Sequence, residues 1–210
     1  MSPTYAIGNH DQSRPASRWG PERAAAAAFL LLMLRGVAVL YAGEEIGMVD
    51  ADPASLPDPP FDRAGRDGCR TPMQWDASPG GGFTGGTPWL PLVDHATRNV
   101  VDQRADAGSL LGLYRRLIAA RAEMPALRQG SHRSIFGTAA DVLAWVREHD
   151  GERVLVLLNV GDGERRLRMP RLPEMSGSGS VVVGTDPRRN GDVALDGLTL
   201  GPLEGLALRL

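Results

Sequence analysis

Two adjacent side chains near the start of the sequence, His10 and Asp11, have types suited to chemistry. They lie in Gly8-Asn9-His10-Asp11, directly after a short apolar run at residues 5–7 that is typical of a buried strand. An imidazole can donate or accept a hydrogen bond, and a carboxylate only accepts. Open and closed α/β sheets place such groups at the carboxyl ends of their strands. An isolated Asn-His-Asp would be better interpreted as turn residues that cap a helix.

The elements around this block favour the functional interpretation. A second apolar, β-rich run at residues 37–41 is typical of a parallel strand buried on both faces. It ends in Gly43-Glu44-Glu45. Between the two runs, Pro21 gives a helix start and Gly36 a stop, so we expect a helix over residues 21–35. Strand, helix and strand in this order predict a parallel βαβ unit, which brings both strand ends to one edge of a sheet.

Three blocks in a fixed order resemble the α-amylase superfamily of retaining glycoside hydrolases, and within it the α-glucosidase and oligo-1,6-glucosidase branch. The resemblance covers nearly the whole chain and is strongest before residue 130. The blocks are Gly8-Asn9-His10-Asp11-Gln12, Tyr41-Ala42-Gly43-Glu44-Glu45-Ile46-Gly47-Met48 and Arg66-Asp67-Gly68-Cys69-Arg70-Thr71-Pro72-Met73-Gln74-Trp75-Asp76.

The resemblance implies a role for several of these residues. Asp11 would be the family's third carboxylate, which contacts sugar hydroxyls and stabilises the oxocarbenium-like transition state. His10 would donate a hydrogen bond to the same sugar, and Arg66 would close the pocket over the non-reducing-end glucose. Arg14 and Glu45 would bind substrate or hold the loops in place, and a structural role is favoured for both.

The resemblance also implies that two catalytic groups lie elsewhere. Retaining glycosidases use two carboxyl groups about 5–5.5 Å apart, one as nucleophile and one as acid/base. In this family they follow barrel strands four and five, upstream of the Asn-His-Asp block. We therefore expect the sequence to begin at barrel strand seven, to lack an N-terminal barrel segment of six strands, and to be inactive alone.

Composition excludes several other classes of protein. The net charge of −2 gives no electrostatic footprint for nucleic acid. All 23 basic residues are Arg, so Schiff-base lysines and the P-loop lysine are absent. A single cysteine, Cys69, cannot form an internal disulfide, and we expect a cytoplasmic protein. The absence of Lys, together with abundant Ala, Gly, Arg and Pro, suggests a GC-rich bacterial genome.

No cofactor, metal or membrane span is expected. The histidines outside the first block, His95, His132 and His149, have no metal-ligand spacing. The apolar stretch of residues 24–43 is about as long as a membrane span, but Arg35-Gly36 interrupts it near the middle. A buried helix followed by a buried strand accounts for the stretch better.

The remaining sequence predicts two further regions. Residues 50–94 carry eight prolines and no periodicity, but their aromatic residues favour an ordered loop on the substrate side. A helix is expected at residues 109–121, stopped by Pro125. After residue 127, seven short apolar runs separated by turn signals, including the Asp150-Gly151 hairpin dipeptide, predict an antiparallel sandwich. A Gly/Ser run at residues 176–180 suggests a mobile loop.

The expected fold class is therefore α/β plus all-β. Residues 1–125 would form the C-terminal end of a (β/α)8 TIM barrel, with strands 7 and 8 and their helices in an incomplete barrel. Residues 126–210 would form an antiparallel β-sandwich. The expected function is the C-terminal portion of a retaining α-glucosidase that hydrolyses α-1,4 or α-1,6 bonds of α-glucoside oligosaccharides. The alternatives are a transglycosylase of the sucrose isomerase or trehalose synthase type, and a non-catalytic remnant or partner subunit.

Overall fold

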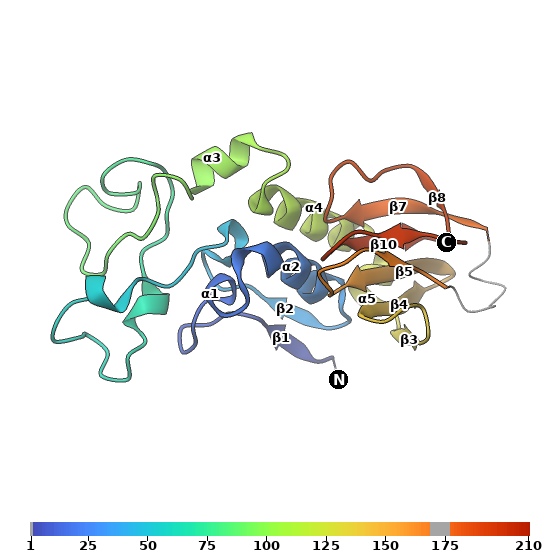
Figure 1. The fold of residues 1–210 in the computed structure, drawn as a ribbon, viewed down its shortest axis with the longest axis horizontal. Coiled ribbons are helices and arrows are strands. Elements are labelled where there is room, and N and C mark those ends of the chain that lie inside the picture. Colours follow the sequence, from blue (N-terminus) through green and yellow to red (C-terminus); the bar gives the residue numbers. More distant parts are fainter. Residues whose placement is uncertain (1, 169–176) are drawn as a thin grey trace. The chain divides into compact units, whose positions relative to one another are not determined.

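The computed structural model describes residues 2–168 and 177–210 (Figure 1). Contacts divide the chain into two compact units. Unit 1 comprises Met1–Tyr5, Ala25–Ala38 and Leu113–Leu210, and unit 2 comprises Ala6–Ala24 and Val39–Gly112. The domain boundary expected at residues 125 and 126 stays a prediction. One of the seven short runs expected to be strands, at residues 165–169, ends outside the described residues, and the Gly/Ser run begins outside them.

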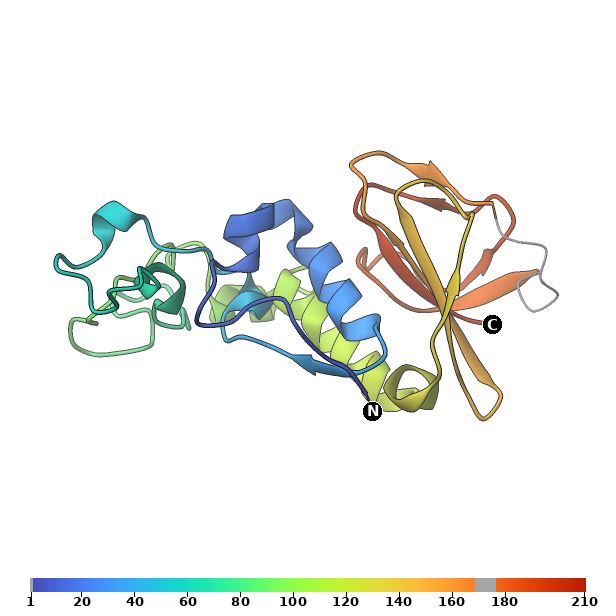
Figure 2. The same cartoon turned by 90° about the horizontal axis from the view of Figure 1, so that it is seen from below.

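The first elements form the expected strand–helix–strand unit. Strands β1 (Thr4–Ala6) and β2 (Val37–Val39) are hydrogen-bonded neighbours and run in the same direction (Figures 1 and 2). Between them lie α1 (Pro15–Trp19), a short 3-10 turn η1 (Pro21–Arg23) and α2 (Ala24–Met33). Helix α1 begins at Pro15 because proline at the first helical position presets a helical φ.

The expected burial of both strands is wrong. All three residues of β1 are exposed, as are Val37 and Val39 of β2. Among the described residues each strand has only the other as a sheet neighbour. A parallel pair reaches full burial only inside a wider sheet that is covered on both faces, and that cover is not present within this part of the chain.

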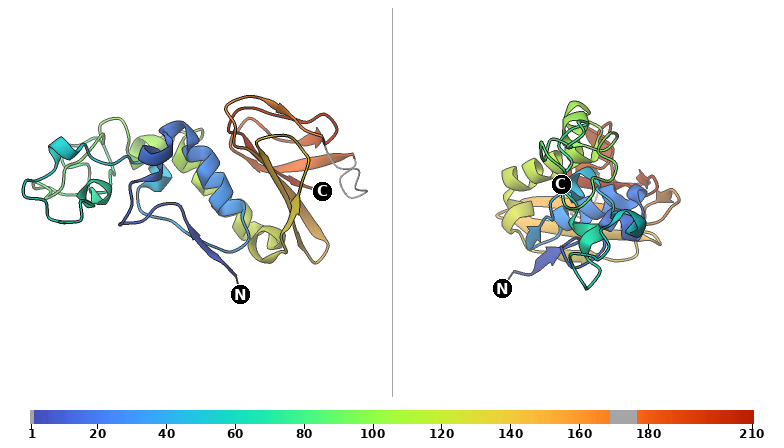
Figure 3. Two further views of the ribbon diagram at one scale, coloured as in Figure 1. Left: turned by 60° about the horizontal axis from the view of Figure 1, so that its bottom comes forward. Right: turned by 90° about the vertical axis from the view of Figure 1, so that its left-hand side faces the viewer.

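Helix α2 is apolar nearly all round because it is covered on several sides. It lies beside α4 (Leu110–Glu123), the helix expected at residues 109–121 (Figures 1 and 3). Its Phe29 is fully buried, and a Cβ at Gly205 would come within 2.5 Å of the Phe29 ring, so that position requires glycine. Pro125 follows α4 as expected and also begins α5 (Pro125–Gln129). Within the described residues, no helix combines the length and apolar character that crossing a bilayer needs.

Unit 1 contains a six-stranded antiparallel sheet. In spatial order its strands are β3 (Arg133–Ile135), β4 (Val142–His149), β5 (Glu152–Asn159), β10 (Gly205–Arg209), β7 (Ser178–Gly184) and β8 (Asp192–Ala194). The hairpin expected at Asp150-Gly151 is confirmed, because φ is +47° and +85° at these residues and His149 pairs with Glu152. Strand β7 includes residues 178–180, which were expected to be part of a mobile loop.

The second layer of the expected sandwich is short. It is a two-stranded antiparallel ribbon of β6 (Arg165–Arg166) and β9 (Thr199–Leu200), and β9 was not expected from the sequence. Leucines from both layers form one buried core: Leu155, Leu157, Leu206 and Leu208 from the sheet, and Leu167, Leu195, Leu198 and Leu200 from the ribbon side. The sheet and the ribbon therefore form a sandwich of unequal layers (Figure 3).

Unit 2 is mostly irregular yet ordered. It contains the 3-10 turns η2 (Glu44–Ile46), η3 (Pro53–Ser55) and η4 (Asp67–Arg70), and the helix α3 (Val100–Ala105). The fully buried Gln74 side chain holds the long loop together. Its amide nitrogen donates to Asp94 Oδ1 and Arg98 O, and its oxygen accepts from the backbone of Val93 and Asp94. These bonds explain why the loop is ordered without regular secondary structure.

Candidate active site after strand β1

His10 and Asp11 lie on the loop that follows β1, as their sequence position indicates. The loop is held close to its surroundings at Gly8, where a Cβ would lie 2.7 Å from Glu44 Oε2 and 3.2 Å from Pro15 Cδ. The Asn9 side chain then accepts from the Asp11 backbone N–H at 2.8 Å and fixes the turn. The His10 and Asp11 side chains remain 66% and 50% exposed, so a ligand can reach both.

Three side chains converge on one oxygen of Asp11. Arg66 NH1 donates to Oδ1 at 2.5 Å, Arg70 NH2 donates to it at 3.3 Å, and His10 Nε2 lies 3.4 Å away. Among the residues that the structure describes, Asp11 Oδ2 has no hydrogen-bond partner. Asp11 is thus held through one oxygen and can accept a ligand hydroxyl with the other.

A second carboxylate, Asp62, completes this group and was not identified from the sequence. Asp62 Oδ2 accepts from Arg66 Nε at 2.5 Å, and Oδ1 accepts from Arg66 NH2 at 3.3 Å. Arg70 NH1 lies 3.1 Å from the same Oδ2. The signal available in the sequence was the four-residue spacing between Asp62 and Arg66. It was missed because the family resemblance begins only at Arg66.

These contacts lower the pKa of Asp62 from 3.8 to about 2, chiefly through the hydrogen bond from Arg66 and then the backbone N–H of Ala64. The folded-state pKa lies below the ordinary value. The stabilisation that the Asp62 contacts give the folded chain is therefore present above that ordinary value and is lost as the pH falls through about 2.

We expect a carboxyl-detected NMR titration to find Asp62 still mainly ionised at about pH 3. In Arg66→Gln the midpoint should move up toward the ordinary 3.8, because the largest cause of the shift is removed. An Ile118→Val variant, altered on the exposed face of α4, should leave the Asp62 midpoint where it is in the unmodified chain. An Asp62 midpoint that does not respond to Arg66→Gln would show that the pair does not form in solution.

Arg14 is placed differently from the other expected binding residues. Arg14 is buried, with only 2% of the residue exposed. Its NH1 donates to Ala42 O at 2.9 Å, and its guanidinium lies 5.0 Å from the Tyr41 ring centroid. Its backbone N–H donates to Asp50 Oδ1 at 2.8 Å. Burial lowers the pKa of Arg14. These contacts join the loops after β1 and β2, which favours the structural role; substrate binding by Arg14 stays a prediction.

Contacts at Gly43, Glu45 and Cys69 likewise favour a structural role. Gly43 has φ +95°, and a Cβ there would lie 2.8 Å from Arg14 NH1, so this position favours glycine. Glu45 Oε2 accepts from the Gly43 backbone at 2.8 Å. Burial raises the pKa of the Cys69 thiol, whose Sγ lies 3.6 Å from His10 O. Burial thus disfavours the thiolate form of Cys69, which is the reactive form of a cysteine.

The geometry of the site limits the chemistry that its side chains can carry out. The described residues contain no group of three or more His, Cys, Asp or Glu side chains arranged to hold a metal ion. Asp62 is a poor nucleophile or proton acceptor, because two arginines hold it and its pKa is about 2. Asp11 is exposed and charged, with one free oxygen. The site is therefore suited to bind a neutral, hydroxyl-rich ligand and to stabilise positive charge on it.

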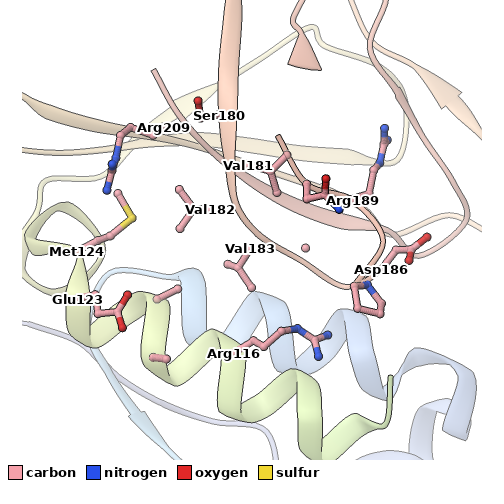
Figure 4. A pocket seen from close by; sticks show the side chains of 15 residues that line it. Arg116, Glu123, Met124, Ser180, Val181, Val182, Val183, Asp186, Arg189 and Arg209 are labelled. Atoms are coloured by element: carbon pink, nitrogen blue, oxygen red, sulfur yellow. The ribbon is translucent and has the colours of Figure 1, made fainter. Parts of the chain in front are cut away.

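One groove of unit 1 contains none of these residues. It has a volume of about 470 Å³ and lies between α4 and β7. Arg116 and Glu123 extend toward it from the helix, and Val183 and Asp186 lie on the opposite wall (Figure 4). Two of the charged residues that line the groove form ion pairs within unit 1. Asp186 pairs with Arg188 at 2.8 Å, and Arg189 pairs with Glu204 at 2.6 Å.

Comparison with known families decides where the chain belongs. The family model of the alpha amylase catalytic domain matches residues 1–130. The chain belongs to the alpha-amylase family. This membership covers the segment that carries His10, Asp11, Arg14 and Arg66, and it bears out the resemblance read from the three sequence blocks.

Individual relatives of this alpha-amylase family chain match most of its length. A "Probable alpha-glucosidase" of Rhizobium meliloti is 40% identical over 193 residues, covering 84% of this chain and 35% of the relative. An "Oligo-1,6-glucosidase" of Heyndrickxia coagulans is 32% identical over 189 residues, 73% of this chain and 34% of the relative. The crystal structure of the trehalulose synthase MutB from Pseudomonas mesoacidophila matches with a TM-score of 0.83 at 30% identity, covering 98% of this chain and 42% of that one. The chain thus spans about a third of the length of these curated relatives.

Proposed function

We propose that this chain supplies the transition-state-stabilising carboxylate and part of the sugar pocket of a retaining α-glucosidase. Its substrates would be oligosaccharides with α-1,4 or α-1,6 glucosidic bonds. The observation that carries the proposal is the exposed Asp11 carboxylate at the end of β1, held through one oxygen by Arg66 and Arg70. The names of the curated relatives support the choice of substrate class.

The roles follow from charge and geometry. Glycosidic bond cleavage places positive charge on the sugar ring, and a nearby carboxylate stabilises it. Asp11 would provide that charge and accept a sugar hydroxyl through Oδ2. His10 would donate to a neighbouring hydroxyl, and Arg66 would fix Asp11 and close the pocket. Asp62 and Asp11 together balance the charges of Arg66 and Arg70, and without Asp62 this group would carry a net positive charge beside a developing cation.

A transglycosylase is the second candidate. The structural match to a trehalulose synthase, which covers 98% of this chain, favours it. The two activities share the first bond cleavage and differ in whether water or a sugar accepts the glucosyl group. Sucrose isomerase and trehalose synthase types both belong to this candidate. A non-catalytic remnant or partner subunit remains a third outcome that experiment can distinguish.

The proposal can be tested with the chain itself and with a hybrid. We expect purified residues 1–210 to give no hydrolysis of p-nitrophenyl-α-glucoside, because the resemblance places the nucleophile and the acid/base before the Asn-His-Asp block. The hybrid would carry the N-terminal part of the Rhizobium meliloti relative, joined to residues 1–210 where the two sequences begin to align. We expect the hybrid to hydrolyse the substrate.

Product analysis separates the candidates. Glucose from maltose or isomaltose would support the glucosidase, and rearranged disaccharides from sucrose would support the transglycosylase. A folded hybrid that is silent on all three sugars would favour the remnant. If residues 1–210 alone hydrolysed the substrate, and Asp11→Ala abolished that activity, the proposal that the nucleophile and the acid/base lie outside this chain would be refuted.

A further inference from the structure

The Arg70 side chain contacts two consecutive residues of the candidate site. Its Nε donates to the backbone carbonyl oxygen of His10 at 2.7 Å, and its NH2 donates to Asp11 Oδ1 at 3.3 Å. Its NH1 lies 3.1 Å from Asp62 Oδ2. Each guanidinium nitrogen therefore has a different partner. Because the guanidinium is planar and rigid, these contacts favour one arrangement of the His10 backbone and the Asp11 carboxylate.

The backbone that carries Arg70 is anchored by residues outside the site. Arg70 is the last residue of η4, and the carbonyl groups before it accept hydrogen bonds from the segment that follows β2. Cys69 O accepts from the Tyr41 hydroxyl at 3.3 Å, and Gly68 O accepts from the Ala51 backbone N–H at 3.0 Å. Arg70 therefore connects the loop after β1 to the segment after β2 within unit 2.

Arg66 holds Asp11 in a different way. The Arg66 guanidinium donates to the carboxylates of Asp11 and Asp62, so its hydrogen bonds join side chains to one another. Arg70 also bonds to the main chain, at the carbonyl of the peptide that joins His10 to Asp11. The orientation of that peptide sets the direction in which the Asp11 side chain leaves the backbone. Arg70 thus restrains both the Asp11 carboxylate and the backbone from which it extends.

We propose that Arg70 is a positioning residue that orients the Asp11 carboxylate, so that Oδ1 is held by the protein and Oδ2 faces the ligand. This inference rests on the proposed function for the role of Asp11. Arg70 acts through Asp11 and does not contact the sugar. A carboxylate that stabilises a transition state must be in place before charge develops on the sugar ring, so its orientation should affect kcat more than substrate binding.

NMR on residues 1–210 tests the orientation directly. Three-bond coupling constants across the Asp11 Cα–Cβ bond report whether its side chain keeps one rotamer. We expect one rotamer in the unmodified chain and averaging over several in Arg70→Met. Arg63→Met is the matched control, because Arg63 is exposed and lies in the same loop, and Asp11 should keep its rotamer there. An Asp11 rotamer that does not respond to Arg70→Met would overturn the proposal.

Kinetics of the hybrid separate positioning from sugar binding. Arg70→Met should lower kcat on p-nitrophenyl-α-glucoside about thirtyfold and change KM by less than about threefold, because a misplaced group weakens transition-state stabilisation. Arg70→Lys keeps the charge but cannot make all three contacts at once, so it should still lower kcat about tenfold. A rise in KM with kcat unchanged would overturn the proposal by assigning Arg70 to sugar binding.

A double-mutant cycle distinguishes positioning of Asp11 from general support of the loop. In a hybrid that already carries Asp11→Asn, Arg70→Met should lower kcat by less than about threefold, because the charge that Arg70 orients is gone. Equal losses in both backgrounds would overturn the proposal. Circular dichroism melting shows which variants are folded. If Arg70→Met does not fold, Arg70→Lys takes its place in each measurement, and the same outcomes decide.

Failure of this inference is distinguishable from failure of the proposed function. A hybrid whose activity requires Asp11 but does not respond to changes at Arg70 removes only the positioning role. A silent hybrid, combined with an Asp11 rotamer that depends on Arg70, removes the glucosidase and leaves Arg70 as the residue that orients Asp11.

Discussion

Asp11→Asn in the hybrid enzyme should lower kcat/KM on p-nitrophenyl-α-glucoside about a thousandfold, which corresponds to ~4 kcal/mol of lost transition-state stabilisation. Asparagine keeps the shape and one acceptor oxygen, so sugar hydroxyls can still bind. The negative charge is lost, and positive charge on the ring develops only in the transition state. The loss should therefore appear mainly in kcat and less in KM.

Asp150→Asn provides the matched control for this change. Asp150 lies in the β4–β5 turn with its side chain 90% exposed, and asparagine also tolerates the positive φ of that position. Its hybrid should keep the activity of the parent. A loss in Asp11→Asn of less than about tenfold would contradict an electrostatic role, because one removed transition-state contact typically costs more.

Arg147→Met should lower the free energy of unfolding of the chain by about 3 kcal/mol. Arg147 is fully buried on β4, and the carbonyl oxygens of Ser131, Met33 and Gly130 accept its hydrogen bonds at 2.9, 3.2 and 3.2 Å. Met33 O belongs to the last turn of α2, whose carbonyls lack partners within the helix. Methionine fills similar volume but removes the guanidinium donor from all three oxygens, and Met33 O keeps only Trp145 Nε1 as a side-chain donor, at 3.3 Å.

The charge on Arg147 is tolerated because of these oxygens. Burial lowers the pKa of Arg147 to about 10, with Arg121 and Arg35 contributing repulsion. The group remains protonated at neutral pH. Arg121 donates to the same helix end, with NH1 bonded to Leu34 O at 2.8 Å and further bonds to Leu32 O and Gly36 O. Two cations thus complement the negative end of the α2 dipole.

Thermal and urea unfolding of residues 1–210 would measure the effect of Arg147→Met. Arg153→Met is the matched control on the neighbouring strand β5, since its side chain is 44% exposed and its pair with Glu148 is long at 3.4 Å. We expect the control to change stability by less than about 0.5 kcal/mol. An Arg147→Met chain as stable as the parent would show that the apolar replacement compensates for the lost bonds.

Local sequence signals determined much of this protein. The order of apolar runs and a helix start at Pro21 predicted the strand–helix–strand unit, because periodicity and φ preferences act within a few residues. The Asp150-Gly151 dipeptide predicted its hairpin for the same reason. The Asn-His-Asp block and its two companion blocks indicated the family and placed Asp11 after a strand.

Only the tertiary structure decided which side chains meet. Asp11 and Arg66 are 55 residues apart in the sequence, and Arg147 and Met33 are 114 apart. No local preference encodes such pairs, because they depend on how the loops and elements pack. The ion pairs of Asp62 with Arg66 and Arg70 were also seen only in the structure.

Burial was likewise decided by packing and not by pattern. The apolar residues of β1 and β2 suggested buried strands, yet they are exposed, because burial needs neighbours that the described residues do not supply. Arg14 and Arg147 are charged residues that a pattern assigns to the surface, yet both are buried, since nearby carbonyl oxygens accept their hydrogen bonds. The types and order of the groups follow from the sequence, whereas three-dimensional packing determined their solvent exposure and their partners.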